Sequence, residues 1–435
     1  MQERTANNSG GSPIDNQVRE ESKHSILLFV STTVTALLSF GYSLYAMKML
    51  GPMRAADFVA AMSVATFFSI ALGPINGTVA KFTTGYAAAN DLGSVARLQR
   101  LAIRNVFRFG GIGFLIGAVL AIPLSSWLQY QSIFPLVLSF AIVWLTLLLS
   151  VARGVLRGLQ RFGAYSINTV TEALVRLLVG VGLLSIWTTT VSGVMAFVVA
   201  LMVILIISQV QMADIWRQFE SPGIESDAII RYLKPMCVMM AITAGFDNMD
   251  MLAVKHLFDP DAAGAYGAAF TLARGTSVLV TPFNIILLPL VAGLQARNAP
   301  VKTTVLRICG YFVTLCAIPL LVFAICPGKV LQLVRLDEFS DAAPLLLPLT
   351  ATRLLGHLNG LIALSYAALG RFGFLKVFIP ALITEVALLA RWHDSNMTVI
   401  LVALFAQAGT LMALAAYSKW PRSADDSEDG RFDLN

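Results

Sequence analysis

Three arginines lie deep inside stretches that are otherwise apolar. Arg176, Arg274 and Arg353 are each many residues from the nearest polar loop, which is too far for the side chain to reach a water interface easily. A guanidinium group presents a rigid fork of donors that matches phosphate or carboxylate. We therefore expect these arginines to line a central cavity and bind an anionic group. For Arg176, the favoured alternative is an ion pair with Glu172, four residues earlier on one helix face.

Titratable side chains in the same apolar stretches are candidates for coupling to an ion, and they are Asp247, Asp250, Glu172, Glu385 and His357. Asp247 and Asp250 share one helix face, and two carboxylates in a poorly solvated site compete for protons. Alternatively, Asp250 pairs with Lys255 near the helix end, or Arg274 reaches either aspartate. His357 follows Arg353 by one helical turn, and a packing role is favoured for it.

Two proline–asparagine pairs recur 208 residues apart, Pro74 with Asn76 and Pro282 with Asn284. A proline inside a helix removes a backbone hydrogen bond and bends the helix, and each asparagine is placed to satisfy the freed groups. These positions are either hinges or static kinks. The pairs belong to an internal repeat, because sliding the chain by 208 residues aligns 52–76 with 260–284 at eight identical positions of 25.

The composition is that of an integral membrane protein. Hydrophobic residues make up 57% and charged residues 13% of the chain, against about 45–50% and about 25% in soluble domains. Helices satisfy their own backbone groups in lipid, so an all-α bundle is expected. Apolar runs predict twelve spans, at roughly 26–47, 57–79, 107–127, 132–152, 166–187, 191–213, 235–256, 264–292, 304–326, 342–367, 375–391 and 398–418.

The distribution of basic residues predicts the orientation. With both termini in the cytoplasm, 22 Lys and Arg lie inside, six lie outside and three lie within spans, as the positive-inside rule requires. The repeat divides the chain into six-helix lobes at 26–213 and 235–418, joined by a cytoplasmic linker at 214–234. Segments 1–25 and 419–435 are expected to be disordered cytoplasmic tails. Two parallel repeats with a ligand site between them, near the midplane, are typical of secondary transporters.

Other chemistries find no support in the sequence. No phosphate-binding glycine loop, HExxH motif or nucleophile elbow occurs, and the cysteines lack metal-site spacing. We therefore expect no cofactor, no metal and no enzymatic activity. The net charge of +6 comes mostly from basic residues at helix ends, so nucleic acid is not an expected partner.

Segments 156–184, 248–274 and 368–376 resemble the polysaccharide exporter branch of the multidrug/oligosaccharidyl-lipid/polysaccharide (MOP) superfamily. This resemblance implies two six-helix lobes that form a V around a water-filled cavity and work by alternating access. It implies a flippase that moves an undecaprenyl-pyrophosphate-linked oligosaccharide to the outer leaflet of a bacterial inner membrane, for surface polysaccharide such as O-antigen or exopolysaccharide. A proton or sodium gradient would drive it, membrane lipids would surround it, and a polysaccharide polymerase is a further expected partner.

Two other functions stay open at this point. A multidrug/cation antiporter of the same superfamily would need a cavity with net acidic character. The deep arginines argue against such a cavity, whereas the acids within the spans keep the antiporter possible. A polytopic glycosyl- or acyltransferase would need a catalytic constellation on one face, and the sequence presents none.

Overall fold

The computed structural model describes residues 13–219, 226–279 and 301–417, together with positions 283, 287, 290, 291 and 294. Throughout these ranges the regular structure is helical. Nine of the described helical stretches are long and apolar enough to cross a membrane. The prediction of an all-α, multi-span membrane protein is thereby confirmed.

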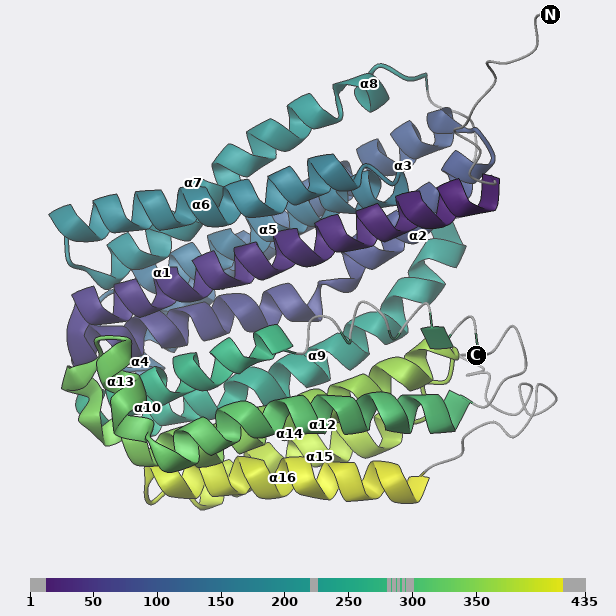
Figure 1. The fold of residues 1–435 in the computed structure, drawn as a ribbon. Coiled ribbons are helices and arrows are strands. Elements are labelled where there is room, and N and C mark those ends of the chain that lie inside the picture. The colour runs from purple at the N-terminus through teal and green to yellow at the C-terminus, as the bar shows by residue number, and fades with distance from the viewer. Residues whose placement is uncertain are drawn as a thin grey trace, which may run out of the picture.

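The first half of the chain contains α1 (Pro13–Ala71), α2 (Pro74–Ala88), α3 (Leu92–Asn105), the π-helix η1 (Val106–Gly110), α4 (Gly111–Trp127), α5 (Phe134–Gly158), α6 (Phe162–Ile186), α7 (Thr190–Gln211) and α8 (Ala213–Trp216). α1 crosses the bundle twice, turning back between the two crossings (Figure 1). The turn lies at Gly51, whose φ of 70° and ψ of 173° are open to glycine and strained for other residues. Two expected spans thus form one interrupted helix.

The second crossing of α1 does not bend at a proline, as the sequence predicts, but ends. Leu72 and Gly73 form a turn, and Pro74 is the first residue of α2, a position where the missing N–H costs nothing. The side-chain oxygen of Asn76 accepts a hydrogen bond from Nη1 of Arg157 at 3.3 Å instead of serving the backbone. Pro282 and Asn284 lie outside the described residues.

The second half contains α9 (Ser226–Leu257), α10 (Pro260–Gly275), the 3₁₀ helix η2 (Thr276–Leu279), α12 (Val301–Ile325), α13 (Pro327–Leu333), the 3₁₀ helix η3 (Asp337–Ala342), α14 (Ala343–Ala368), α15 (Leu375–Arg391) and α16 (Asn396–Tyr417). Two helices begin earlier than predicted. α9 starts at residue 226 rather than 235, and residues 13–25, which we expected to be disordered, form the start of α1. Glutamine, glutamate and arginine in that segment favour helix without being apolar.

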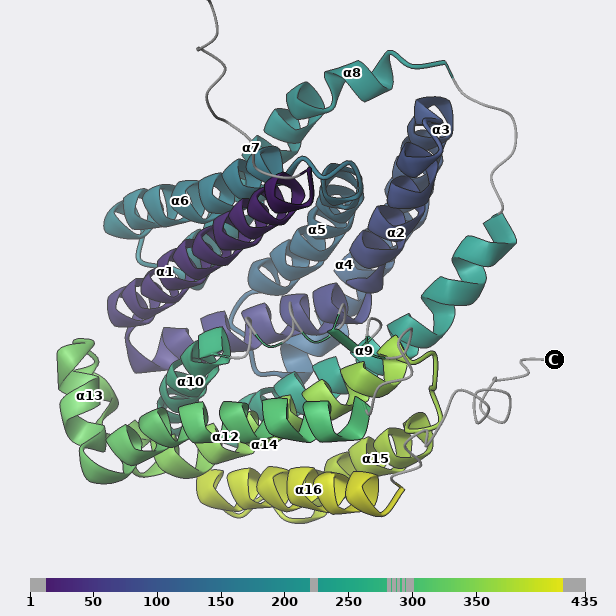
Figure 2. The same ribbon diagram turned by 45° about the vertical axis from the view of Figure 1, so that its right-hand side comes forward.

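Figures 1 and 2 show the helices of the two halves on opposite sides of the bundle. The largest apolar core joins them, because it combines residues of α1, α5 and α7 with residues of α9, α10 and α14. The contact is closest at Gly264 of α10, where an added Cβ would lie 2.4 Å from the carbonyl oxygen of Pro52. We call the end of the bundle that contains Gly51, Trp127 and Leu257 the Gly51 end.

The opposite end contains Ala88, Gly158 and Trp216, and we call it the Ala88 end. An ion pair fixes α8 there, since Nη1 of Arg161 donates to Oδ1 of Asp214 at 2.9 Å. The Arg161 guanidinium lowers the pKa of the Asp214 carboxyl. Arg100 of α3 also donates to the carbonyl oxygen of Trp216 at 2.5 Å, so α3, α6 and α8 are tied together.

Candidate functional site

A cavity of about 400 Å³ lies between the two crossings of α1, α7 and the α10–η2 segment. Its wall therefore comes from both halves of the chain, with Ser39 and Phe58 on α1, Phe197 on α7, and Phe270 and Arg274 on α10. Arg274 is the one charged side chain among the described residues that line it. We call this space the Arg274 cavity.

Arg274 is the arginine that meets the sequence-based expectation most directly. Its guanidinium carbon lies 5.8 Å from the centre of the Phe270 ring, one helical turn away on the same face. No ion pair to Arg274 is found within the described part of the chain. Its donors are therefore available to an anion in the cavity.

Arg176 lies behind the α7 wall of the cavity. Its guanidinium carbon stands 4.6 Å from the centre of the Phe197 ring, and Nη2 donates to Oγ of Ser39, which lines the cavity. The predicted pair with Glu172 forms at 3.6 Å. However, Arg153 approaches the same carboxylate to 2.7 Å. One glutamate thus balances two arginines, which leaves positive charge beside the cavity.

Arg353 is buried behind the opposite wall and does not line the cavity. It pairs with Asp250, it donates through Nη1 to the carbonyl oxygen of Phe246 at 3.1 Å, and its guanidinium carbon lies 4.6 Å from the centre of the Phe270 ring. Tyr266 donates to the same carboxylate oxygen of Asp250 at 2.5 Å. The sequence suggested Lys255 or Arg274 as the partner of Asp250, and Arg353 takes that place instead.

The remaining candidates for ion coupling come from three helices, α9, α14 and α15, and each of them interacts electrostatically with Arg353. Glu385 of α15 is fully buried, and neither carboxylate oxygen has a hydrogen-bond partner among the described residues. Asp247 is half-buried on α9. The Nε2 atom of His357 lies 2.7 Å from Oγ of Ser277, which lines the Arg274 cavity. The histidine is thus joined to the cavity through one hydroxyl.

Sequence reasoning missed two contributions to the site and one contact between the two halves. Phe270 precedes Arg274 by four residues, a spacing that could have indicated the stacked pair. Phe197 carries no such local signal. The pair between Lys255 Nζ and Asp57 Oδ1, 2.8 Å long near the Gly51 end, joins positions 198 residues apart, and no local pattern could reveal it.

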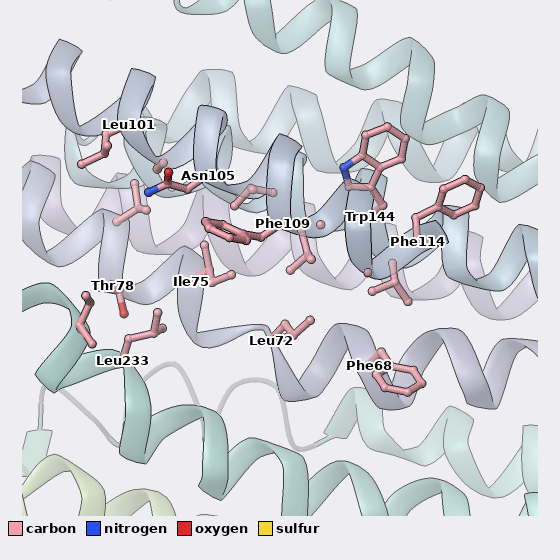
Figure 3. A pocket seen from close by; sticks show the side chains of 18 of the residues that line it. Phe68, Leu72, Ile75, Thr78, Leu101, Asn105, Phe109, Phe114, Trp144 and Leu233 are labelled. Atoms are coloured by element: carbon pink, nitrogen blue, oxygen red, sulfur yellow. The ribbon is translucent and has the colours of Figure 1, made fainter. Parts of the chain in front are cut away.

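A second and larger cavity of about 560 Å³ lies among the end of α1, α2, α3, η1, α4, α5 and the start of α9. Its lining is apolar or glycine except for Thr78 and Asn105 (Figure 3). Trp144 of α5 forms part of its wall. We call this space the Trp144 cavity, and nothing in the sequence pointed to it.

The helical arrangement, with a charged cavity between two halves, is that of a multi-span membrane transporter. The chain belongs to the polysaccharide biosynthesis protein family, whose model matches residues 97–338. This membership agrees with the resemblance seen in the sequence, and it favours a transporter over an enzyme. A comparison with curated protein sequences found no match.

Several solved structures share the fold. An inward-facing multidrug resistance MATE family transporter of the MOP superfamily has a TM-score of 0.67 at 12% identity, covering 91% of this chain and 99% of its own. The lipid II flippase MurJ, in an inward closed conformation, has a TM-score of 0.66 at 11% identity, covering 91% and 88%. A MOP superfamily transporter from Pyrococcus furiosus has a TM-score of 0.60 at 14% identity, covering 91% and 95%.

Proposed function

We propose that this protein is a flippase that moves an undecaprenyl-pyrophosphate-linked oligosaccharide from the inner to the outer leaflet of a bacterial inner membrane. The observation that carries the proposal is the Arg274 cavity, which is lined by an arginine from one half and bordered by a second arginine, Arg176, from the other. Pyrophosphate is a ligand that guanidinium groups bind well. Membership of the polysaccharide biosynthesis family supports this class of cargo.

In this proposal twelve spans form two six-helix lobes, 26–213 and 235–418, that make a V around the cavity and rock to expose it to either side. Both termini are cytoplasmic, so the Ala88 end faces the cytoplasm. Arg274 contacts the head group directly. Arg176 acts through the Phe197 wall, because it contributes positive potential without reaching the ligand. Arg353 is paired with Asp250 and supports the Phe270 wall from behind.

An intramembrane acid would couple the cycle to a proton or sodium ion. Glu385 is the best placed of the candidates, because a buried carboxylate whose oxygens have no hydrogen-bond partner among the described residues carries a large cost that a bound cation would reduce. Glu172 and Asp250 already have arginine partners, and Asp247 and His357 are secondary candidates. An antiporter for cationic drugs is disfavoured, because no acidic side chain lines the Arg274 cavity among the described residues.

The test is complementation of a deletion strain, read as surface polysaccharide. Wild type is expected to restore the polysaccharide, and Arg274→Ala to restore little of it, at equal membrane abundance. Arg274→Lys separates charge from the guanidinium fork, since lysine keeps only the charge. Arg307→Ala, an exposed arginine on α12, is the matched control and is expected to behave as wild type. Intact polysaccharide in the deletion strain, with raised sensitivity to cationic drugs, would replace the flippase by the antiporter.

A further inference from the structure

The Trp144 cavity has the dimensions and surface of a site for one hydrocarbon chain. Along η1 and α4 its lining runs from Val106 to Leu120, which is about 21 Å at 1.5 Å per residue. Half of the hydrocarbon core of a bilayer is only about 15 Å thick. The cavity can therefore hold a chain from the head-group region to beyond the midplane.

Glycines open the wall of this cavity on one face of η1 and α4. A Cβ at Gly110 would lie 2.8 Å from Trp144, and one at Gly117 would lie 2.5 Å from Phe140. At these two glycines η1 and α4 therefore pack closely against α5. A Cβ at Gly113 would meet nothing within 4 Å. Gly113 therefore faces open space inside the cavity. The π-helical turn of η1 borders the same space, and such turns occur frequently at functional sites.

Basic residues are frequent in the helices that line the Trp144 cavity. Five basic residues directly adjoin lining residues in the chain, and all five are exposed: Lys81, Arg104, Arg108, Arg231 and Lys234. The segment 74–127 holds five basic residues and a single acid, Asp91. The Asp91 carboxylate accepts from the backbone N–H of Ser94 at 2.9 Å and caps α3. An anionic head group with one long apolar chain is complementary to this arrangement.

The two cavities share the second crossing of α1. Met62 and Thr66 line the Arg274 cavity, whereas Phe68 and Leu72 line the Trp144 cavity. The helix ends directly after these residues, at the turn before α2. A chain in one cavity and a head group in the other would thus lie on two sides of a single helix crossing.

We propose that the Trp144 cavity is the site of the polyprenyl chain of the lipid-linked substrate. The basic residues at the Ala88 end hold its phosphate on entry from the inner leaflet, before the head group reaches Arg274. This inference rests on the proposed function and adds a place for the chain. The strong positive charge favours a pyrophosphate lipid over a zwitterionic one. The aromatic lining, including Phe82, Phe114 and Phe140, offers flat faces to an unsaturated, methyl-branched chain.

The direct test uses the full-length protein in lipid nanodiscs and a photoactivatable analogue of undecaprenyl phosphate, with cross-links mapped by mass spectrometry. Cross-links are expected on η1, α4 and α5, and unlabelled undecaprenyl phosphate should compete for them. Gly113→Leu places a side chain in the open space and should weaken labelling about tenfold, because it displaces several chain methylenes. Gly182→Leu is the matched control, because a Cβ added at this exposed α6 glycine would also meet no atom within 4 Å. The Gly182→Leu protein should be labelled as strongly as wild type.

A second pair of measurements keeps the test informative if Gly113→Leu lowers abundance. Replacing Arg104 and Arg108 by glutamine should weaken labelling by the phosphate probe and leave labelling by an uncharged polyprenol probe unchanged. The contrary result is that a phosphatidylglycerol probe labels the cavity as strongly as the undecaprenyl phosphate probe, with no competition by unlabelled undecaprenyl phosphate. That result would mean that the cavity holds surrounding phospholipid only, and it would overturn the inference. Normal polysaccharide with Gly113→Leu, together with its loss with Arg274→Ala, would overturn the inference while leaving the flippase intact.

Discussion

At the scale of single residues, the charges inside the membrane differ in how fully they are paired. Arg353 and Asp250 are both buried and form one ion pair, and the Tyr266 hydroxyl and the Phe246 carbonyl oxygen each add a hydrogen bond to it. Arg274 lines a cavity and has no such partner among the described residues. The Arg353–Asp250 pair therefore holds the second half of the bundle together, whereas Arg274 is available to a ligand.

Removing one partner of the buried pair is expected to destabilise the fold. Arg353→Ala leaves Asp250 as an uncompensated buried charge, and the free energy of unfolding should fall by about 3–5 kcal/mol. The double variant Arg353→Met with Asp250→Leu removes both charges and should regain most of that loss. Thermal unfolding in detergent measures the effect. Arg274→Ala serves as the control with little change in stability, and a loss as large as that of Arg353→Ala would mean that Arg274 is structural.

The residue types of this site could be predicted from the sequence, but their pairing could not. A charge in an apolar run is visible locally, and the run itself gives the helix. Arg353 and Asp250 are 103 residues apart, however, and only the packing of α9 against α14 brings them together. The nearby alternative of Lys255 as the partner of Asp250 was chosen because the two are close in the chain, and it was wrong, since Lys255 pairs with Asp57.

At the scale of elements, hydropathy predicted the helices and missed the places where they stop. The second crossing of α1 ends at Ala71 although the apolar pattern continues to residue 79. The cause is the turn at Gly73, which lets Pro74 start α2 instead of bending a longer helix. Helix α9 starts early, since Ile229, Ile230 and Leu233 find an apolar surface in the Trp144 cavity.

The turn inside α1 depends on one glycine. Gly51 has φ +70°, and a Cβ added to it would meet no atom within 4 Å, so the cost of Gly51→Ala should come from backbone strain alone. We expect a loss of about 1–3 kcal/mol in the free energy of unfolding. Gly85→Ala, inside α2 and equally open, is the control and should gain up to about 1 kcal/mol. Denaturant unfolding followed by circular dichroism compares them, and equal stability of both variants would contradict the strain.

At the scale of the whole molecule, the two halves are fastened at the Gly51 end. Besides the Lys255–Asp57 pair, the His256 ring stacks on Trp127 with 4.1 Å between centroids, and its Nδ1 lies 2.6 Å from the Trp127 carbonyl oxygen. Gln129 donates to the His256 carbonyl oxygen at 2.9 Å. In the proposed alternating-access cycle these contacts break once in each turn, because the cavity would open on this side to release cargo.

Joining the halves permanently at the Gly51 end should therefore stop transport without unfolding the protein. The test variant carries Asp57→Cys and Lys255→Cys in a background without the native cysteines, and it is treated with a short cleavable thiol cross-linker. The cross-linked protein should lose flipping of a lipid-linked oligosaccharide in vesicles. It should regain this activity after the cross-linker is cleaved. The matched control cross-links Arg54→Cys to Thr188→Cys, whose native side chain and carbonyl oxygen lie 2.5 Å apart within the first half. That cross-link spans no moving boundary and should leave flipping unchanged. Full activity of the Asp57–Lys255 cross-linked protein would rule out rocking of the two halves about this end, and with it alternating access as the mechanism of the flippase.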